Sequence, residues 1–322
     1  MTENNLIQMH LEKKIKKSIK KILKHNLEKV INQEYNIETI HKYRVYIRRL
    51  RSILEEFINE IKIELNLIYE LREFFRKLGK IRDYDILIEN LEKYHKELQN
   101  IENKNLDTCI EILNKEFEKK RKKRINQLID FLDSKKYKKI IDDLEYLKDN
   151  IKFKNFYISD SDTHSIIFLI LSKFYKLLSH SYWNIEIYDI KALHHLRRQI
   201  KRTRYYMELF KKFYKKNDEY KNIINQLKEL QDISGEIVDL FVLKDELEKF
   251  QRKHISDISD NNESEIKLSN TIQIFDLWLQ EKEAVLFNQW NEKKKEFYES
   301  KDHYVSIIKE NCRIEYLEMK DI

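Results

Sequence analysis

The chain has 322 residues with no proline and two glycines, and 63 Lys and Arg against 56 Asp and Glu give a formal net charge of +7. β-Sandwiches and β-barrels need frequent turn residues, and Rossmann and P-loop nucleotide sites need clustered glycines, so this composition excludes these classes. A net charge of +7 over this length is also too small to indicate general DNA binding. What remains is a chain of long helices with a heavily charged surface.

Hydrophobic residues recur at helical spacing along almost the whole chain, which predicts an all-α fold. Because proline is absent, Asn, Asp and Ser side chains must start and stop the helices by capping. The clearest break is the polar segment SDSDTHS at 159–165. In chain order, we expect helices at residues 6–31, 38–60, 64–98, 104–150 with an interruption, 163–182, 189–215, 218–253 and 266–318.

The helix expected at 38–60 carries the segment HKYRVYIRRLR, which starts at His41. At about 100° per residue, one side of this segment is hydrophobic and the opposite side is basic. The basic side consists of His41, Arg44, Arg48 and Arg51, with Arg49 on its flank. A solvated helix face usually mixes acids and bases at i,i+4, whereas these eleven residues include no acid.

The helix expected at 189–215 repeats this pattern 153 residues later, in HHLRRQIKRTR. Its basic side consists of His194, Arg197, Lys201 and Arg204, with Arg202 on its flank. Arginine is favoured here in a chain otherwise rich in lysine, and a planar guanidinium binds phosphate oxygens through paired hydrogen bonds. The repeated stripe therefore predicts an anion site, and a solvated charged face is the alternative for either helix taken alone.

The two glycines occupy equivalent positions of the repeat, Gly79 in LGKIRDYD and Gly235 in ISGEIVD. A glycine inside a helix costs about 1 kcal/mol relative to alanine, so each indicates close approach of another helix or of a ligand. One turn further on, Asp83 and Asp239 are placed to pair with arginines of the stripes. The repeat divides the chain into two related halves of about four helices each, expected at residues 1–156 and 157–322.

The helices that carry the glycines add positive charge unequally. The first contributes Arg72, Arg76 and Arg82. The second has Lys228 where the first has Arg72, but Asp232 and Val238 replace the other two arginines. We therefore expect an asymmetric basic lining.

Together these motifs resemble the CHAD family, the conserved histidine α-helical domain. The likeness rests on HKYRVYIRRLR, LGKIRDYD, HHLRRQIKRTRYYMELF and LKELQDISGEIVD in this order and spacing, and it covers nearly the whole chain. The resemblance implies two four-helix bundles related by pseudo-twofold symmetry, with a central basic cavity that binds inorganic polyphosphate. The polyphosphate-binding residues that we expect are His41, Arg44, Arg48, Arg49, Arg51, Arg72, Arg76, Arg82, His194, Arg197, Lys201, Arg202, Arg204 and Lys228.

The sequence favours a non-catalytic binding protein, because no nucleophile–base pair, Cys–His set or HExxH motif is visible. We expect no cofactor and no metal. The alternative is an enzyme, or an accessory subunit of one, that processes polyphosphate or a phosphorylated metabolite. For that alternative, Asp83, Asp85 and Asp239 are the available metal-binding carboxylates. Nucleic-acid binding is a weaker third hypothesis.

The expected location is the cytosol. The longest apolar stretch, 166–171, has six residues, whereas a membrane span needs about 20, so we expect no membrane partner. Two cysteines far apart in the sequence, Cys109 and Cys312, do not make a disulfide scaffold and favour a reducing compartment. The resemblance adds polyphosphate granules as a finer location.

Overall fold

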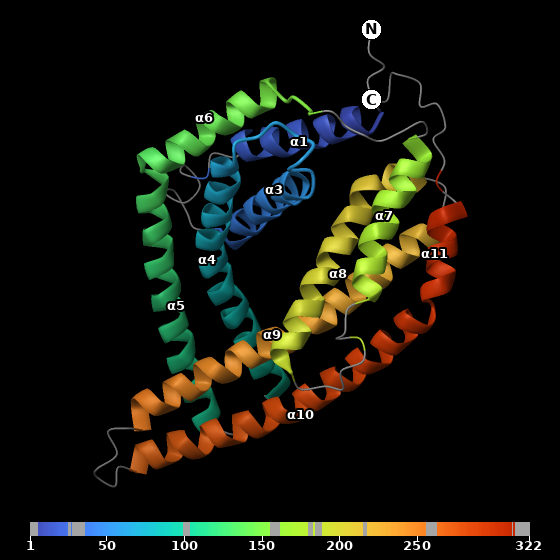
Figure 1. Cartoon of the computed structure of the whole chain (residues 1–322). Coiled ribbons are helices and arrows are strands. Elements are labelled where there is room, and N and C mark those ends of the chain that lie inside the picture. Colours follow the sequence, from blue (N-terminus) through green and yellow to red (C-terminus); the bar gives the residue numbers. More distant parts are fainter. Residues whose placement is uncertain are drawn as a thin grey trace. The chain divides into compact units, whose positions relative to one another are not determined.

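The computed structural model describes residues 6–24, 27, 36–98, 104–154, 162–179, 183, 189–214, 218–255, 263–310 and 312 (Figure 1). This part of the chain is helical apart from turns and one isolated β-bridge, between Ile61 and Phe153, so the all-α prediction is confirmed. The α-helices are α1 (Leu6–Lys24), α3 (Ile37–Glu56), α4 (Leu65–Leu98), α5 (Lys104–Leu132), α6 (Lys135–Asp149), α7 (Asp162–Leu178), α8 (Ile190–Phe210), α9 (Asp218–Ile255), α10 (Glu263–Glu299) and α11 (Lys301–Glu310). A short 3₁₀-helix, η2 (Lys211–Tyr214), follows α8.

The two helices that carry the basic motifs start with the same capping device. At the start of α3, the Asn36 carboxamide oxygen accepts hydrogen bonds from backbone N–H groups two and three residues ahead, at 2.8 and 3.3 Å. At the start of α8, the Asp189 carboxylate does the same at 2.9 and 3.1 Å. Each cap lies five residues before the first histidine of the motif, so both stripes begin at the same depth in their helix.

Most predicted helices are present, with two informative breaks. The expected interruption of 104–150 occurs where Ser134 caps α6 and accepts a hydrogen bond from the backbone N–H of Tyr137 at 3.2 Å. The prediction of one helix over 266–318 is wrong, because α10 ends at Glu299 and α11 begins at Lys301. The predicted helix ends at residues 31, 182, 215 and 318 lie outside the described residues.

The chain packs as two compact units. One unit contains α1, α3 and α6 with α4 up to Ile86 and α5 from Phe117. The other contains the remaining parts of α4 and α5 with α8, α9, α10 and α11 and with α7 from Ile166. The predicted halves, 1–156 and 157–322, describe a sequence repeat rather than packing and stay a prediction.

An aromatic core fixes α3 against its neighbours in the first unit. Phe74 of α4 contacts the rings of Tyr43, Phe131 and Tyr137, with centroid distances of 5.9, 5.4 and 5.4 Å. The buried Tyr43 hydroxyl donates to the backbone carbonyl of Ile22 at 3.0 Å, which ties α3 to α1. These contacts bury the hydrophobic side of α3 and leave its basic side outside the core.

A second aromatic core fixes α8 and α9 in the other unit. The stacked rings of Tyr214 and Tyr220 lie 3.8 Å apart, and the Tyr220 hydroxyl donates to the backbone carbonyl of Met207 at 3.0 Å. The end of α4 joins this unit, where Tyr94 meets Trp278 of α10 with ring centroids 5.1 Å apart. The second basic motif is therefore held on a helix that is packed along its hydrophobic side.

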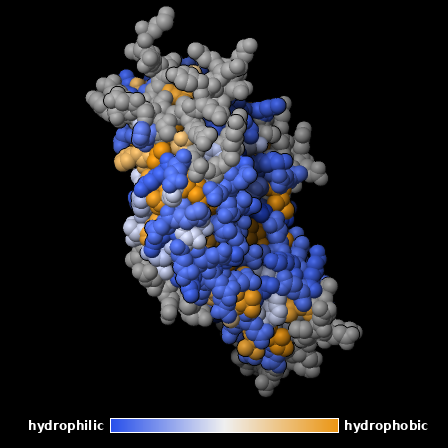
Figure 2. Space-filling model, turned by 90° about the vertical axis from the view of Figure 1, so that its right-hand side faces the viewer, coloured by the Kyte–Doolittle hydropathy of each residue, from blue (hydrophilic) through white to orange (hydrophobic). Residues whose placement is uncertain are grey.

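The surface is largely polar. Most of the residues that Figure 2 colours are hydrophilic, and hydrophobic residues show among them as patches. Among the described helices, none combines the length and the apolar character that a bilayer crossing requires.

Candidate functional site

The first basic motif lies on α3 as the sequence predicts. Ile40, Tyr43 and Ile47 are buried. On the opposite side, His41 is exposed and Arg44 is half-buried. Arg48, also half-buried, follows one turn later along the same side.

The second basic motif has the same arrangement on α8. Leu193, Leu196 and Ile200 are buried, whereas His194 is exposed and Arg197 is half-buried. Lys201, in the position equivalent to Arg48, is also half-buried. In each unit, a histidine and two longer cationic side chains thus follow one another along one side of a helix.

The Arg44 guanidinium is held between two groups of α4. It lies over the Phe75 ring with 4.6 Å to the centroid, and a Cβ built on Gly79 would lie 2.8 Å from its Nη1 atom. Burial lowers the pKa of Arg44, and the negative charge of Asp83 opposes this shift. Nη1 is buried and has no hydrogen-bond partner within the described part of the chain.

The Arg197 guanidinium lies against Gly235 of α9 in the same way. A Cβ on Gly235 would lie 2.8 Å from Nη2 and 3.5 Å from both Cζ and Nε of Arg197. The sequence predicted another helix or a ligand at each glycine. What fills the space is a stripe arginine, since the nearest atoms to either Cβ position all belong to Arg44 or Arg197.

At the C-terminal end of each stripe, the positive charge of the last arginine is balanced by an acidic side chain. Arg51 donates to Glu55 through Nη2 and Nε at 2.7 and 3.1 Å, and Arg72 donates to the same oxygen at 2.9 Å. Burial raises the pKa of Glu55, but the hydrogen bonds from Arg72 and Arg51 outweigh it and lower the pKa. Glu55 lies four residues beyond the motif. The sequence-based prediction therefore missed it, because it considered acids only within the eleven residues of the motif.

The second stripe ends in the equivalent pairing. Arg204 forms an ion pair with Glu208, the counterpart of Glu55, and donates from Nε to Gln231 at 3.2 Å. Its guanidinium also lies over the Tyr205 ring, 4.5 Å from the centroid. The last arginine of each stripe is thus already engaged by protein groups.

The remaining predicted cations differ in their surroundings. Arg76 pairs with Glu73, and the exposed Arg49 lies near Lys14 of α1, whose pKa is lowered mainly by burial and further by nearby cations. Arg202 is also exposed, on the flank of α8. Arg82 is half-buried and lies close enough to influence His41.

The histidines lie in positive surroundings. Partial burial lowers the pKa of His41, the charge of Arg82 lowers it further, and Glu38 opposes both. Partial burial also lowers the pKa of His194, and the cation with the next largest effect is Arg198.

Arg198 is a residue that the sequence analysis missed. It is exposed on α8 and contacts the His195 ring, with 2.6 Å between Nη2 and Nδ1. Four residues after His194, it lies about 40° from that histidine around the helix, on the stripe side. The signal was present in the sequence, but the repeat obscured it, because the equivalent residue of the first motif is Val45.

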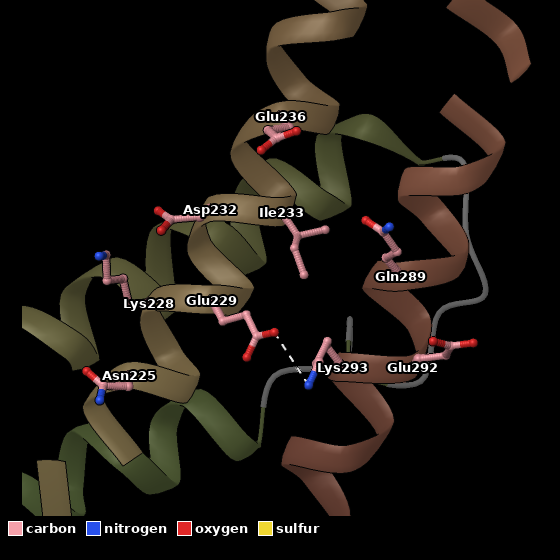
Figure 3. A pocket seen from close by; sticks show the side chains of 9 residues that line it. All are labelled: Asn225, Lys228, Glu229, Asp232, Ile233, Glu236, Gln289, Glu292 and Lys293. Carbon is pink, nitrogen blue, oxygen red and sulfur yellow. Dashed lines mark ion pairs between the residues drawn. The ribbon is translucent and has the colours of Figure 1, made fainter. Parts of the chain in front are cut away.

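Lys228 lines a groove of about 660 Å³ between α9 and α10 (Figure 3). In Figure 3, Lys228 and Asp232 project from the same side of α9, while Glu229 points across to Lys293, 3.4 Å away. Four acids and two lysines line this groove, so its charge does not suit a polyanion. The lining residues are Asn225, Lys228, Glu229, Asp232, Ile233, Glu236, Gln289, Glu292 and Lys293.

The carboxylates available for metal chemistry are largely engaged with cations. Asp85 is fully buried and lies 3.6 Å from Nη1 of Arg121 on α5. Burial raises the pKa of Asp83, the positive charge of Arg44 opposes this shift, and the nearby Asp85 adds to it. In the described ranges, no three His, Cys, Asp or Glu side chains gather in a way that could hold a metal ion.

Comparisons with known proteins agree with the motifs. The solved structures that the chain resembles include PptA from Streptomyces chartreusis (TM-score 0.62, 10% identity, 92% of this chain and 98% of that chain) and the crystal structure of the CHAD domain from the plant Ricinus communis (TM-score 0.65, 18% identity, 89% and 91%). No curated protein matches the chain. A family model described as the CHAD domain matches residues 13–248, which include both basic motifs, and the chain therefore belongs to the CHAD family.

Proposed function

We propose that this protein binds inorganic polyphosphate through the basic stripes of α3 and α8 and does not process it. The observation that supports this most directly is the repeated cluster on these helices. In each unit, a histidine, an arginine lying against a glycine and a further cation follow one another along one helix side. No acid occurs in either motif to compensate them.

The spacing of these cations suits a linear polyanion. Side chains three and four residues apart on a helix are about 4.5 and 6 Å apart along its axis. The cations therefore form a row along the helix, which one extended polyanion can follow. Guanidinium groups donate two parallel hydrogen bonds to phosphate oxygens, which makes arginine better suited than lysine to this contact.

The predicted cations differ in their place along the stripes, and four of them, Arg51, Arg72, Arg76 and Arg204, form ion pairs with acids. We infer that the main ligand contacts come from the residues at the start and middle of each stripe and from Arg82 of α4, whose charge acts on His41. The cations paired with acids contribute less, because the ligand must compete with an existing carboxylate partner. The main contacts are His41, Arg44, Arg48 and Arg82 in one unit and His194, Arg197, Arg198 and Lys201 in the other.

The test is a calorimetric titration with polyphosphates of graded length, with duplex DNA as competitor at physiological salt. The variant Arg44→Ala with Arg197→Ala should bind far more weakly than wild type. The control, Lys249→Ala with Arg252→Ala, removes the same charge from exposed residues of α9 and should bind normally. Equal loss in both variants, or no wild-type binding, would overturn the proposal.

The same samples test the absence of catalysis. Incubation of long-chain polyphosphate with the protein and magnesium or manganese should release no phosphate. Release that is lost in the Arg44→Ala with Arg197→Ala variant would replace the binding function by the enzymatic alternative. The proposed ligand also implies a cytosolic protein at polyphosphate granules, which imaging of a fluorescently tagged chain would test.

A further inference from the structure

The space beside each glycine is shaped for one side chain. A Cβ at Gly79 would lie 2.8 Å from Nη1 of Arg44, closer than real Cβ atoms approach any neighbour. Apart from its own helix and chain neighbours, the only other described atom within 4 Å is Cζ of the same arginine, at 3.9 Å. An alanine could therefore not occupy position 79 while the guanidinium stays where it is.

The second unit repeats this contact with a different neighbour. Gly235 makes room for Nη2 of Arg197, although Gln231 stands where the first unit has Phe75. The chain has only two glycines, and each lies beside the same arginine of its repeat. Both units thus have the glycine and the arginine, whereas only the first has an aromatic ring packed on that arginine.

Backbone geometry gives no other reason for these glycines. Both lie inside long α-helices, and neither has the positive φ that favours glycine. Glycine weakens a helix relative to alanine, so each position carries a cost in stability. That cost is explained if the free space serves the arginine.

We propose that Gly79 and Gly235 are positioning residues, which let the guanidinium groups of Arg44 and Arg197 approach α4 and α9 closely, in the orientation that binds polyphosphate. This inference rests on the proposed function. A side chain at either glycine pushes the tip of a flexible arginine rather than backbone, so the fold accommodates it easily. The arginine then points elsewhere, and its hydrogen bonds to the ligand are lost.

The first test is Gly79→Ala, with Gly235→Ala as its counterpart. Each should weaken polyphosphate binding about ten- to hundredfold, the loss expected for one charged hydrogen bond. Each should also leave the melting temperature unchanged or raise it by roughly one to three degrees, because alanine favours the helix. A glycine needed for close helix packing would instead lower the melting temperature markedly, and that result would overturn the proposal.

The second test asks whether each glycine acts through its own arginine. In an Arg44→Ala background, Gly79→Ala should cause no further loss of binding. In an Arg197→Ala background, the same substitution should still cause its full loss, which makes this the matched control. Equal losses in both backgrounds would contradict the positioning role.

A third readout needs no ligand and separates this inference from the proposed function. Gly79→Ala should raise the melting temperature more when Arg44 is already alanine, because the new Cβ then meets no guanidinium. If wild type binds no polyphosphate but this coupling is present, the proposed function fails and the contact stands. If wild type binds polyphosphate but Gly79→Ala and Arg44→Ala are coupled neither in affinity nor in melting temperature, only the positioning role fails.

Discussion

The stripes of α3 and α8 share one plan and differ in detail, which separates what the arrangement requires from what it tolerates. Both place a histidine five residues after the capping residue, an arginine beside a glycine, and a final arginine paired with a glutamate. They differ in the cation one turn beyond the glycine-bound arginine, which is Arg48 in one and Lys201 in the other. Arg82 of the first unit is replaced by Val238 in the second. With Arg82 of α4 included, the first unit therefore supplies more guanidinium groups, although Arg198 of the second adds one where the first has Val45.

The largest expected effect comes from removing two central cations of one stripe. Arg44→Ala with Arg48→Ala should cost on the order of 3–6 kcal/mol, more than a hundredfold in polyphosphate affinity, since charged hydrogen bonds contribute about 1.5–3 kcal/mol each. Arg197→Ala with Lys201→Ala should cost less affinity, because the second residue removed is a lysine, which does not make the paired hydrogen bonds of a guanidinium. Calorimetry at fixed salt measures both, after circular dichroism has shown that the variants fold. An equal or larger loss in the second variant would contradict the comparison.

Stoichiometry in the same titrations tests the sequence-based prediction that a single polyphosphate contacts both stripes. A polyphosphate too short to wrap round the surface should bind once per chain if both stripes contact it. Under that hypothesis, each double variant loses nearly all affinity. A variant that keeps one site of wild-type affinity would show two separate sites.

A tenfold effect is expected where the units differ most. Arg82→Val gives the first unit the residue of the second and should weaken binding about tenfold, as loss of one charged contact does. The reciprocal Val238→Arg should tighten it and steepen the dependence of log affinity on log salt by just under about one, borrowing the nucleic-acid coefficient. Affinity measured from 50 to 200 mM salt checks both. An unchanged slope in both variants would place position 82 outside the site.

A smaller effect is expected where the units agree. Glu55→Gln removes the carboxylate that holds Arg51 and Arg72, with side chains of Glu55 and Arg51 only 21% and 17% exposed. The variant should lose about 1–2 kcal/mol of stability at neutral pH and bind polyphosphate a few-fold more tightly, because two cations are released. Glu208→Gln should do the same in the second unit.

The pH dependence of this stability has a definite sign. Because the arginines lower the folded-state pKa of Glu55, its contribution is present above the unfolded pKa of about 4.5 and is lost as the pH falls through the folded value. Wild type and Glu55→Gln should therefore converge in melting temperature in the acid range. A difference that persists at pH 2 would show that the loss has another cause.

The sequence predicts the fold and the stripes because both depend on periodicity, which a single chain displays. The hydrophobic side of α3, an interruption somewhere within 104–150 and the equivalence of the two glycines were predicted from the sequence, whereas the position of that interruption, at Ser134, was not. The break between α10 and α11 was missed, because Ser300 interrupts the helix without changing the hydrophobic pattern. Periodicity does not record such a local change in backbone direction.

The pairing of cations with acids could not be predicted to the same extent. Glu55 forms ion pairs with Arg51 of its own helix and with Arg72 of the next one. Only the pair with Arg51 can be seen in the sequence, as an i,i+4 relation. The groove that Lys228 lines is formed partly by residues of α10, and this helix carries none of the repeat motifs. Sequence equivalence assigned Lys228 to the site because it occupies the position of Arg72, whereas its surroundings depend on tertiary contacts.

The smallest expected effect concerns His41 and His194, which begin the two stripes. Burial and neighbouring cations lower the pKa of both, so they are mainly neutral in the free protein near pH 7.5. Bound polyphosphate favours the protonated form and raises both pKa values, so binding takes up protons and tightens as the pH falls. Affinity should rise on the order of a few-fold from pH 8 to pH 6, beyond any change in the ligand's own charge.

The variant His41→Ala with His194→Ala supplies the reference for that change, since the ligand's titration affects it equally. Calorimetry in buffers of different ionisation enthalpy should show proton uptake by wild type that this variant lacks. His41→Ala and His194→Ala alone should each remove part of the uptake, because the pKa of each histidine is lowered in the free protein. Identical pH profiles for wild type and the double variant would mean that the histidines bind as neutral groups, and the cationic role would then belong to the arginines and Lys201 alone.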